Sequence, residues 1–246
     1  MSLALPHGWI APRWPAPAPV RALSTTRAGG CSRGRYALLN LSTRVGDDPT
    51  AVERNREVLR GVLGLDPLWL HQVHGTGVAD AESAPALVQA DAAVARTRHR
   101  ACAVLTADCL PVLLAERDGA AVAAVHAGWR GLAAGVLEAA VARMGVAGER
   151  LLAWLGPAIG QAAYEVGEDV RRAFVTGDPA AAGAFRAGRP GKYHADLYAL
   201  ARLRLGRLGV TAVGGGGWCT FTERDRFYSY RRDGATGRMA TVIWID

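Results

Sequence analysis

Short apolar runs and amphipathic stretches alternate along the whole chain. The apolar runs have the length of β-strands and lie at residues 20–26, 101–106, 120–125, 151–155 and 242–245. Two of them, residues 101–106 and 120–125, are too apolar for the edge of a sheet. Strands that are apolar at every position are typical of sheets covered on both faces, so these two runs predict central, buried strands.

Between the apolar runs, helical spacing predicts helices over residues 49–63, 131–144, 167–174 and 196–208. Thr50 is in a position to cap the first of them. The Gly-, Ala- and Pro-rich segment 178–191 predicts a loop. No fixed-period repeat and no clear linker divides the chain. We therefore expect one α+β domain over residues 1–246, in which layered mixed β-sheets are flanked by helices.

Composition narrows the range of partners. Half of the 246 residues are hydrophobic and 21% are charged, which is not the composition of a disordered chain. The net charge is 29 − 22 = +7. Its densest basic stretch, residues 96–100, has no interleaved aromatic residue to stack on bases. We interpret the surplus as a solvated surface that attracts anionic substrates, and we expect no nucleic-acid partner.

The apolar runs, the N-terminal residues and the cysteines indicate the cellular compartment of the protein. No uncharged apolar run approaches the roughly 20 residues of a membrane span, and no export signal is visible at the N-terminus. The four cysteines, at positions 31, 102, 109 and 219, are too few and too scattered for a disulfide scaffold. We therefore expect a cytoplasmic protein with reduced thiols and no membrane partner.

Candidate chemistry is concentrated where apolar segments give way to loops, at residues 70–75, 106–111 and 125–131. Cys109 and His126 are only 17 residues apart and belong to neighbouring apolar regions, so adjacent strands could hold them a few ångströms apart. With His74 they form a set of three ligands, the number that a catalytic zinc site uses when its fourth position stays open. The sequence therefore indicates a metal centre.

A metal-free interpretation uses the same residues. In it, His126 generates a thiolate nucleophile at Cys109. The neighbouring Asp108 would then orient a histidine or carry a proton. Spacing alone does not separate the two interpretations.

An ordered set of motifs identifies a family resemblance over nearly the whole chain. The blocks are T-T-R-A-G-G (25–30), N-L (40–41), G-D-D-P (46–49), N-R (55–56), Q-V-H-G (72–75), A-D-C-L-P-V (107–112), H-A-G-W-R-G (126–131), G-P-A-I-G with Y-E-V (156–166), C-T (219–220) and F-Y-S-Y-R-R-D-G with G-R-M-A (227–240). This set resembles the family first called multicopper polyphenol oxidase (laccase-domain) proteins, now regarded as purine nucleoside phosphorylases. The resemblance implies that His74, Cys109 and His126 are zinc ligands; His71 lies outside the motif.

The resemblance also implies an activity. It implies phosphorolysis of adenosine, inosine, guanosine and methylthioadenosine, and deamination of adenosine to inosine. The co-substrates would then be a purine nucleoside and phosphate. Zinc lowers the pKa of bound water toward about 7, which is the chemistry of zinc nucleobase deaminases. We assign catalytic roles to His74, Cys109, His126 and Asp108, and substrate- or phosphate-binding roles to Arg27, Asn40, Arg130 and Arg231.

Three alternatives remain open. A copper polyphenol oxidase needs a second, imidazole-rich cluster, and six histidines are too few for it, so zinc is favoured over copper. A Cys-His amidase, or an enzyme that edits peptidoglycan precursors, would use Cys109 as nucleophile. A nucleotide-binding protein would hold the metal only for structure. The oligomeric state is not indicated by the sequence.

Overall fold

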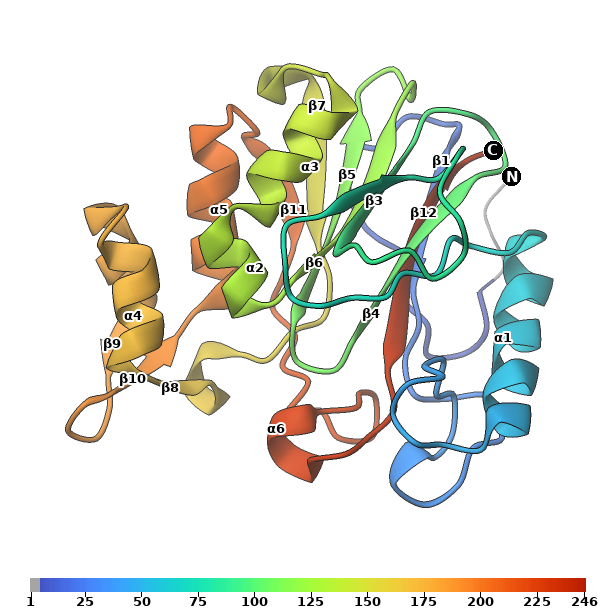
Figure 1. Cartoon of the computed structure of the whole chain (residues 1–246), viewed down its shortest axis with the longest axis horizontal. Helices are drawn as coiled ribbons and strands as arrows, with labels where there is room; N and C mark the ends of the chain where they lie inside the picture. The colour runs from blue at the N-terminus through green and yellow to red at the C-terminus, as the bar shows by residue number, and fades with distance from the viewer. Residues whose placement is uncertain (1–4) are drawn as a thin grey trace.

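The structure is a computed structural model that describes residues 5–246. Two β-sheets lie face to face (Figure 1). Helix α1 (Pro49–Leu63) lies outside one sheet, and helices α2 (Trp129–Ala134), α3 (Val136–Met144) and α5 (Leu197–Arg207) lie outside the other. The three-stranded sheet has the order β1 (Val20–Ser24), β12 (Met239–Ile245), β4 (Ala101–Thr106). The six-stranded sheet has the order β11 (Ala212–Gly215), β7 (Leu151–Leu155), β5 (Leu110–Glu116), β6 (Val122–Ala127), β3 (Ala92–Ala95), β2 (Val78–Asp80).

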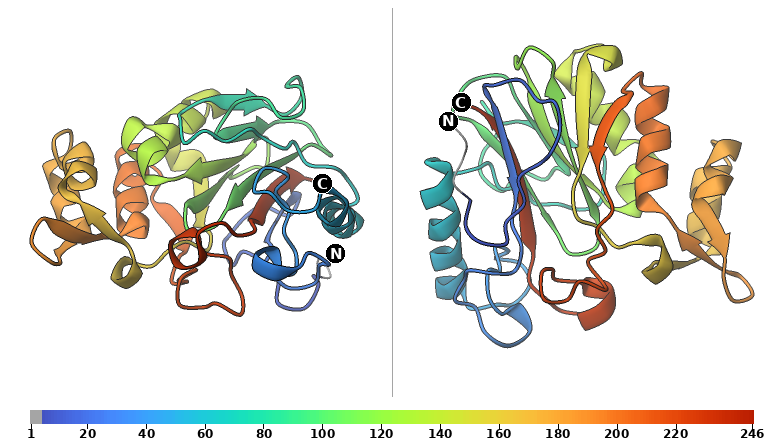
Figure 2. Two further views of the ribbon diagram at one scale, coloured as in Figure 1. Left: turned by 60° about the horizontal axis from the view of Figure 1, so that its bottom comes forward. Right: turned by 180° about the vertical axis from the view of Figure 1, so that it is seen from behind.

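Most of the remaining elements lie on the side of the six-stranded sheet that α2, α3 and α5 cover. Helix α4 (Glu168–Val175) is among them, and the short α6 (Tyr230–Asp233) precedes β12. A small third sheet has the order β8 (Glu165–Gly167), β10 (Lys192–Ala195), β9 (Phe185–Ala187). Figure 2 shows this sheet and α4 at the end of the molecule opposite α1.

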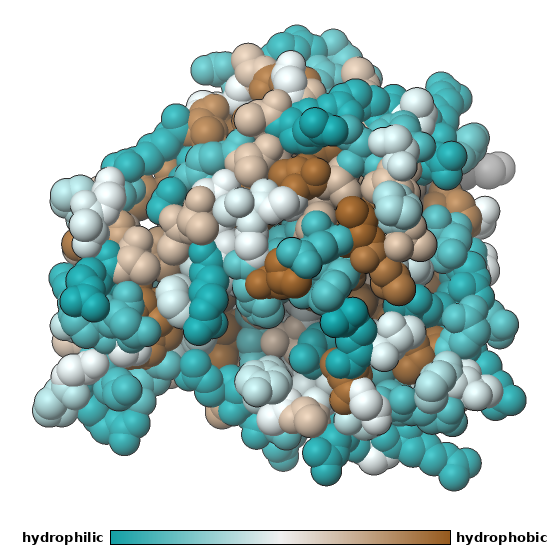
Figure 3. All heavy atoms as spheres, viewed as in Figure 1, coloured by the Kyte–Doolittle hydropathy of each residue, from teal (hydrophilic) through white to brown (hydrophobic). Residues whose placement is uncertain are grey.

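The strands are apolar at successive positions because both faces of each large sheet are covered. On β5, Leu113 packs between the two sheets, whereas Leu114 packs against the helices on the far side. On β12, Ile243 likewise faces the six-stranded sheet, and Trp244 faces α1. Polar residues cover most of the face of the molecule shown in Figure 3. The predicted α+β architecture with layered, helix-flanked sheets is confirmed.

Helix α1 has the predicted bounds, but its cap differs from the prediction. The N-cap is Asp48, whose carboxylate accepts a 2.9 Å hydrogen bond from the backbone N–H of Thr50. Pro49 occupies the first turn, where its missing N–H costs nothing. Gly64 ends the helix in the left-handed conformation, with φ of 71°.

Two predictions about strands need correction. The apolar run 101–106 was predicted to be a central strand, but β4 is at one end of the order β1-β12-β4. It is apolar because its faces are buried between α1 and the six-stranded sheet, not because strands pair on both sides. The neighbours of β6 are β5 and β3, two strands that the sequence analysis did not predict. Pro111 near the start of β5 is a residue that usually argues against a central strand.

One predicted helix and one predicted loop also change in detail. The segment 131–144 is divided into α2 and α3 by Gly135, whose φ of 100° favours glycine. The predicted loop 178–191 contains a 3₁₀ helix over Pro179–Ala184 and strand β9. All four cysteines are free, as predicted. Within residues 5–246, none of the helices has the length and apolar character that crossing a membrane requires.

Candidate metal centre and its pocket

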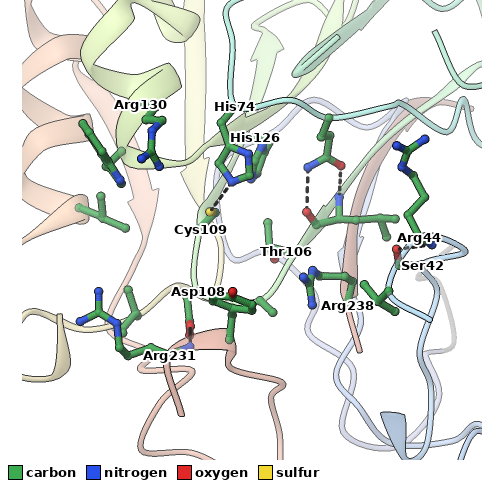
Figure 4. Close-up of a pocket in the computed structure, with 18 of the residues that line it drawn as sticks. Ser42, Arg44, His74, Thr106, Asp108, Cys109, His126, Arg130, Arg231 and Arg238 are labelled. Carbon is green, nitrogen blue, oxygen red and sulfur yellow. Dashed lines mark hydrogen bonds between the residues drawn. The ribbon is translucent and has the colours of Figure 1, made fainter. Parts of the chain in front are cut away.

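Three side chains that could ligate a metal ion meet at one end of the six-stranded sheet. Ligand atoms of His74, Cys109 and His126 all lie within 4.8 Å of one another. Sγ of Cys109 is 3.7 Å from Nε2 of His74, and the two imidazole rings meet edge to face with centroids 4.7 Å apart (Figure 4). The structure thus brings together the three residues that the sequence analysis selected.

Strand pairing explains why Cys109 and His126 meet. Cys109 directly precedes β5, and His126 lies near the end of β6, opposite Pro111 in the antiparallel register. Gly128 directly follows β6 and lies against the side chains of His74 and Cys109. A Cβ atom on Gly128 would lie 2.8 Å from His74 Cδ2 and 3.1 Å from Cys109 Sγ. Only glycine leaves room for both donors here.

Asp91, which the sequence analysis missed, forms hydrogen bonds with the ring of His126 and with the backbone of His74. Asp91 is fully buried and directly precedes β3. Its Oδ1 lies 2.8 Å from Nδ1 of His126, and its carboxylate also accepts backbone N–H groups from residues 73–75. The one available signal was an aspartate at the start of an apolar run, Ala92–Ala95.

Asp108 has a different set of contacts. Its carboxylate accepts hydrogen bonds of 2.6 Å from the hydroxyl of Thr220 and of 2.6 Å from the backbone N–H of Arg231. The histidine-orienting role expected for Asp108 therefore belongs, by geometry, to Asp91. Asp108 lines the pocket and has φ of 92°, so it bends the chain just before Cys109.

The charges and hydrogen bonds around Cys109 favour its thiolate form. Burial alone would raise the pKa of the Cys109 thiol, but the charge and hydrogen bonds of His126, together with those of His74, lower that pKa to about 6. The thiolate is the form of cysteine that ligates metals and acts as a nucleophile. The geometry thus suits either use.

The donors open into a pocket of about 560 Å³. Its lining includes the apolar and aromatic residues Trp129, Ile159, Tyr164, Leu197 and Tyr230. In Figure 4, Arg130 and Arg231 lie on one side of the donors and Arg44 and Arg238 on the other. The ion pairs formed by residues 5–246 involve other arginines, so none of these four has a carboxylate partner within 4.0 Å.

Arg44 had no distinguishing signal in an arginine-rich sequence, and Arg238 lies in the G-R-M-A block but was given no role in the sequence analysis. Burial lowers the pKa of the Arg238 guanidinium, which donates hydrogen bonds to the backbone carbonyls of residues 236 and 237. Gln72, also unpredicted, exchanges two hydrogen bonds with the backbone of Leu105, of 2.9 and 2.8 Å. These bonds attach the loop that carries His74 to β4.

Two predicted substrate-binding residues do not line the pocket. The guanidinium of Arg27 donates to the carbonyls of Ala37 and Arg224 and lies over the ring of Tyr228. Asn40 is fully buried, and its amide bonds Ser42, Asp47 and the backbone N–H of Arg238. Arg27 and Asn40 therefore hold turns together, because all their polar groups are already engaged there.

Sequence comparison places these features in a family. A family model described as multi-copper polyphenol oxidoreductase laccase matches residues 21–246. The chain belongs to this family. A Pseudomonas aeruginosa relative, named as a purine nucleoside phosphorylase, is 54% identical over 97% of this chain and 99% of its own. An Escherichia coli relative with the same activity in its name is 52% identical over 96% of this chain and 98% of its own.

Solved structures of family proteins share the fold. A Neisseria meningitidis protein superposes with a TM-score of 0.95 at 56% identity, covering 97% of this chain and 99% of that one. The YlmD protein of Geobacillus stearothermophilus superposes with a TM-score of 0.84 at 30% identity, over 93% and 92% of the two chains.

Proposed function

We propose that this protein is a zinc-dependent purine nucleoside phosphorylase that also deaminates adenosine. The observation that carries the proposal is a three-donor centre opening into a pocket whose four arginines lack carboxylate partners. Relatives named as purine nucleoside phosphorylases, 54% and 52% identical over almost the whole chain, support the choice of substrate.

The donor set fits zinc. Two imidazoles and one thiolate are ligands that zinc prefers, and a three-residue set leaves a position free for a small molecule. The bound metal would supply Lewis-acid chemistry and lower the pKa of a water molecule in that position. His74, Cys109 and His126 would hold it. A multicopper oxidase needs further copper ligands, whereas among residues 5–246 these side chains form the single group of three or more.

The arginines suit phosphate. In phosphorolysis, a phosphate oxygen bonds to C1′ of the ribose while the C1′–N9 bond breaks, and the base leaves with a proton. The products of adenosine and phosphate are adenine and ribose 1-phosphate. Positive charge builds on the sugar in this step, so guanidinium groups that fix phosphate beside it would both orient the nucleophile and stabilise the transition state through it. Arg130, Arg231, Arg44 and Arg238, which line the pocket on the two sides of the donors, are our candidates for this role.

The pocket also offers surfaces for the nucleoside. Tyr230 is 60% exposed where it lines the pocket, so its ring is free to contact a purine. Tyr228, in contrast, is fully buried, and its hydroxyl donates to the carbonyl of Tyr36. Deamination would add water at C6 of adenosine and release ammonia, yielding inosine.

The test is incubation of zinc-loaded protein with adenosine, with and without inorganic phosphate, followed by chromatographic identification of the products. We expect adenine and ribose 1-phosphate only when phosphate is present, and inosine in both incubations. Cys109→Ala should abolish both reactions, whereas Cys31→Ala, a change at an exposed cysteine, should keep them. Adenine release at an equal rate without phosphate would show a hydrolase instead.

The amidase interpretation keeps one supporting observation. Cys109, His126 and Asp91 are arranged as nucleophile, base and orienting carboxylate. The metal-free alternative predicts that hydrolysis of an amide, such as a short peptide of cell-wall type, persists after chelation of zinc. The proximity of His74 to Cys109, at 3.7 Å, favours metal binding over this role.

A further inference from the structure

We propose that Asp91 is a positioning residue for the metal centre, where one carboxylate sets the orientation of both histidine donors. The inference rests on the metal site of the proposed function. It concerns a buried residue that does not line the pocket and that the sequence motifs did not single out.

Asp91 controls His126 through two hydrogen bonds. Its Oδ1 accepts from Nδ1 of the imidazole at 2.8 Å, and its backbone carbonyl accepts from the backbone N–H of His126 at 2.7 Å. With Nδ1 carrying the proton, the lone pair of Nε2 is left for the metal. The bond therefore fixes both the tautomer and the direction of the ring.

The same carboxylate controls His74 through the backbone. It accepts N–H groups from Val73 at 3.1 Å, His74 at 2.9 Å and Gly75 at 2.7 Å. Successive N–H groups that converge in this way form a concave anion-binding nest. His74 has φ of 61°, a left-handed conformation that side chains other than glycine rarely adopt. The three bonds hold the loop in this strained form, which directs His74 toward Cys109.

A second buried carboxylate, that of Glu116, also binds a turn but has no contact with the histidines. Glu116 is also buried, 4% exposed, and its carboxylate also accepts two backbone N–H groups of a turn, from Asp118 and Ala120. Glu116 lies at the other end of β5 and contacts none of the metal donors. It therefore provides a matched control for the loss of a buried carboxylate.

The experiment compares the zinc affinity of the wild type, Asp91→Asn and Glu116→Gln by competition with a chromophoric chelator. In Asp91→Asn, an NH₂ group replaces one carboxylate oxygen and faces an N–H group, where the wild type has a hydrogen-bond acceptor. One or both histidines therefore lose their orientation. We expect Asp91→Asn to bind zinc 10- to 100-fold more weakly, and Glu116→Gln to stay within about twofold of the wild type. Unchanged affinity in Asp91→Asn, or an equal loss in Glu116→Gln, would overturn the proposal.

A second measurement needs no variant and decides the matter even if Asp91→Asn does not fold. Long-range ¹H–¹⁵N spectra of the zinc-loaded wild type should show His126 protonated at Nδ1. Protonation at Nε2 would refute the proposed orientation. Because neither experiment uses substrate, a protein that binds zinc as expected but does not cleave adenosine would refute the proposed function and leave the role of Asp91 intact.

Discussion

The hydroxyl of Thr220 donates a 2.6 Å hydrogen bond to the carboxylate of Asp108, across 112 residues of sequence. Both groups are buried, and the second oxygen of the same carboxylate binds the backbone N–H of Arg231. Asp108 therefore attaches the C-terminal segment to the turn that carries Cys109. This attachment builds one wall of the pocket, which Asp108 and Arg231 both line.

Replacement of Thr220 by Val should destabilise the protein, because it leaves a buried carboxylate oxygen without its donor. We expect a loss of about 1–3 kcal/mol in the free energy of unfolding, measured by denaturant titration. Thr222→Val is the control, since Thr222 is exposed and its hydroxyl makes only a 3.4 Å contact with the carbonyl of Cys219. Equal stability of the two variants would contradict the inferred role of the Thr220–Asp108 bond.

Cys109→Ala should remove most of the bound zinc while the fold persists. The wild type should contain one zinc per chain after dialysis against zinc-containing buffer, measured by atomic emission. The core between the sheets does not include the donor side chains, so far-ultraviolet circular dichroism should stay unchanged. Full zinc occupancy in Cys109→Ala would mean that the metal binds elsewhere.

Gly128→Ala should weaken zinc binding without loss of the fold. The added methyl group would lie 2.8 Å from His74 Cδ2 and must displace one of the donors. The φ of Gly128 is −65°, so alanine causes no backbone strain. Gly61→Ala in α1 is the control, because nothing lies within 4 Å of its new Cβ. The prediction fails if chelator competition gives the same zinc affinity for Gly128→Ala and Gly61→Ala.

Arg238→Ala should raise the KM for phosphate more than the KM for adenosine. A hydrogen bond to a charged group contributes about 1.5–3 kcal/mol, so we expect an increase of tenfold or more. Arg21→Ala, at a surface ion pair with Asp246, should leave both constants unchanged. An increase confined to adenosine would move the nucleoside, rather than phosphate, to the Arg238 side of the pocket.

Local patterns in the sequence determined several parts of this protein. The bounds of α1 follow from Pro49 at its start, Gly64 after its end and the apolar spacing between them. The layered α+β architecture follows from apolar runs of strand length that alternate with amphipathic helices. The three candidate metal donors, two histidines and one cysteine, stand at the ends of apolar segments, where polar side chains reach the surface. Each of these signals lies within a few neighbouring residues.

Tertiary structure alone decided which groups complete the site. Asp91 meets His126 across 35 residues, and the residue chosen from the sequence, Asp108, lies beside Cys109 but points to Thr220. Nothing local distinguishes the pocket's Arg238 from Arg27, in which each guanidinium nitrogen donates to a backbone carbonyl. These contacts depend on strand register and on how the two sheets stack, because a shift of one residue in a strand turns every side chain to the opposite face.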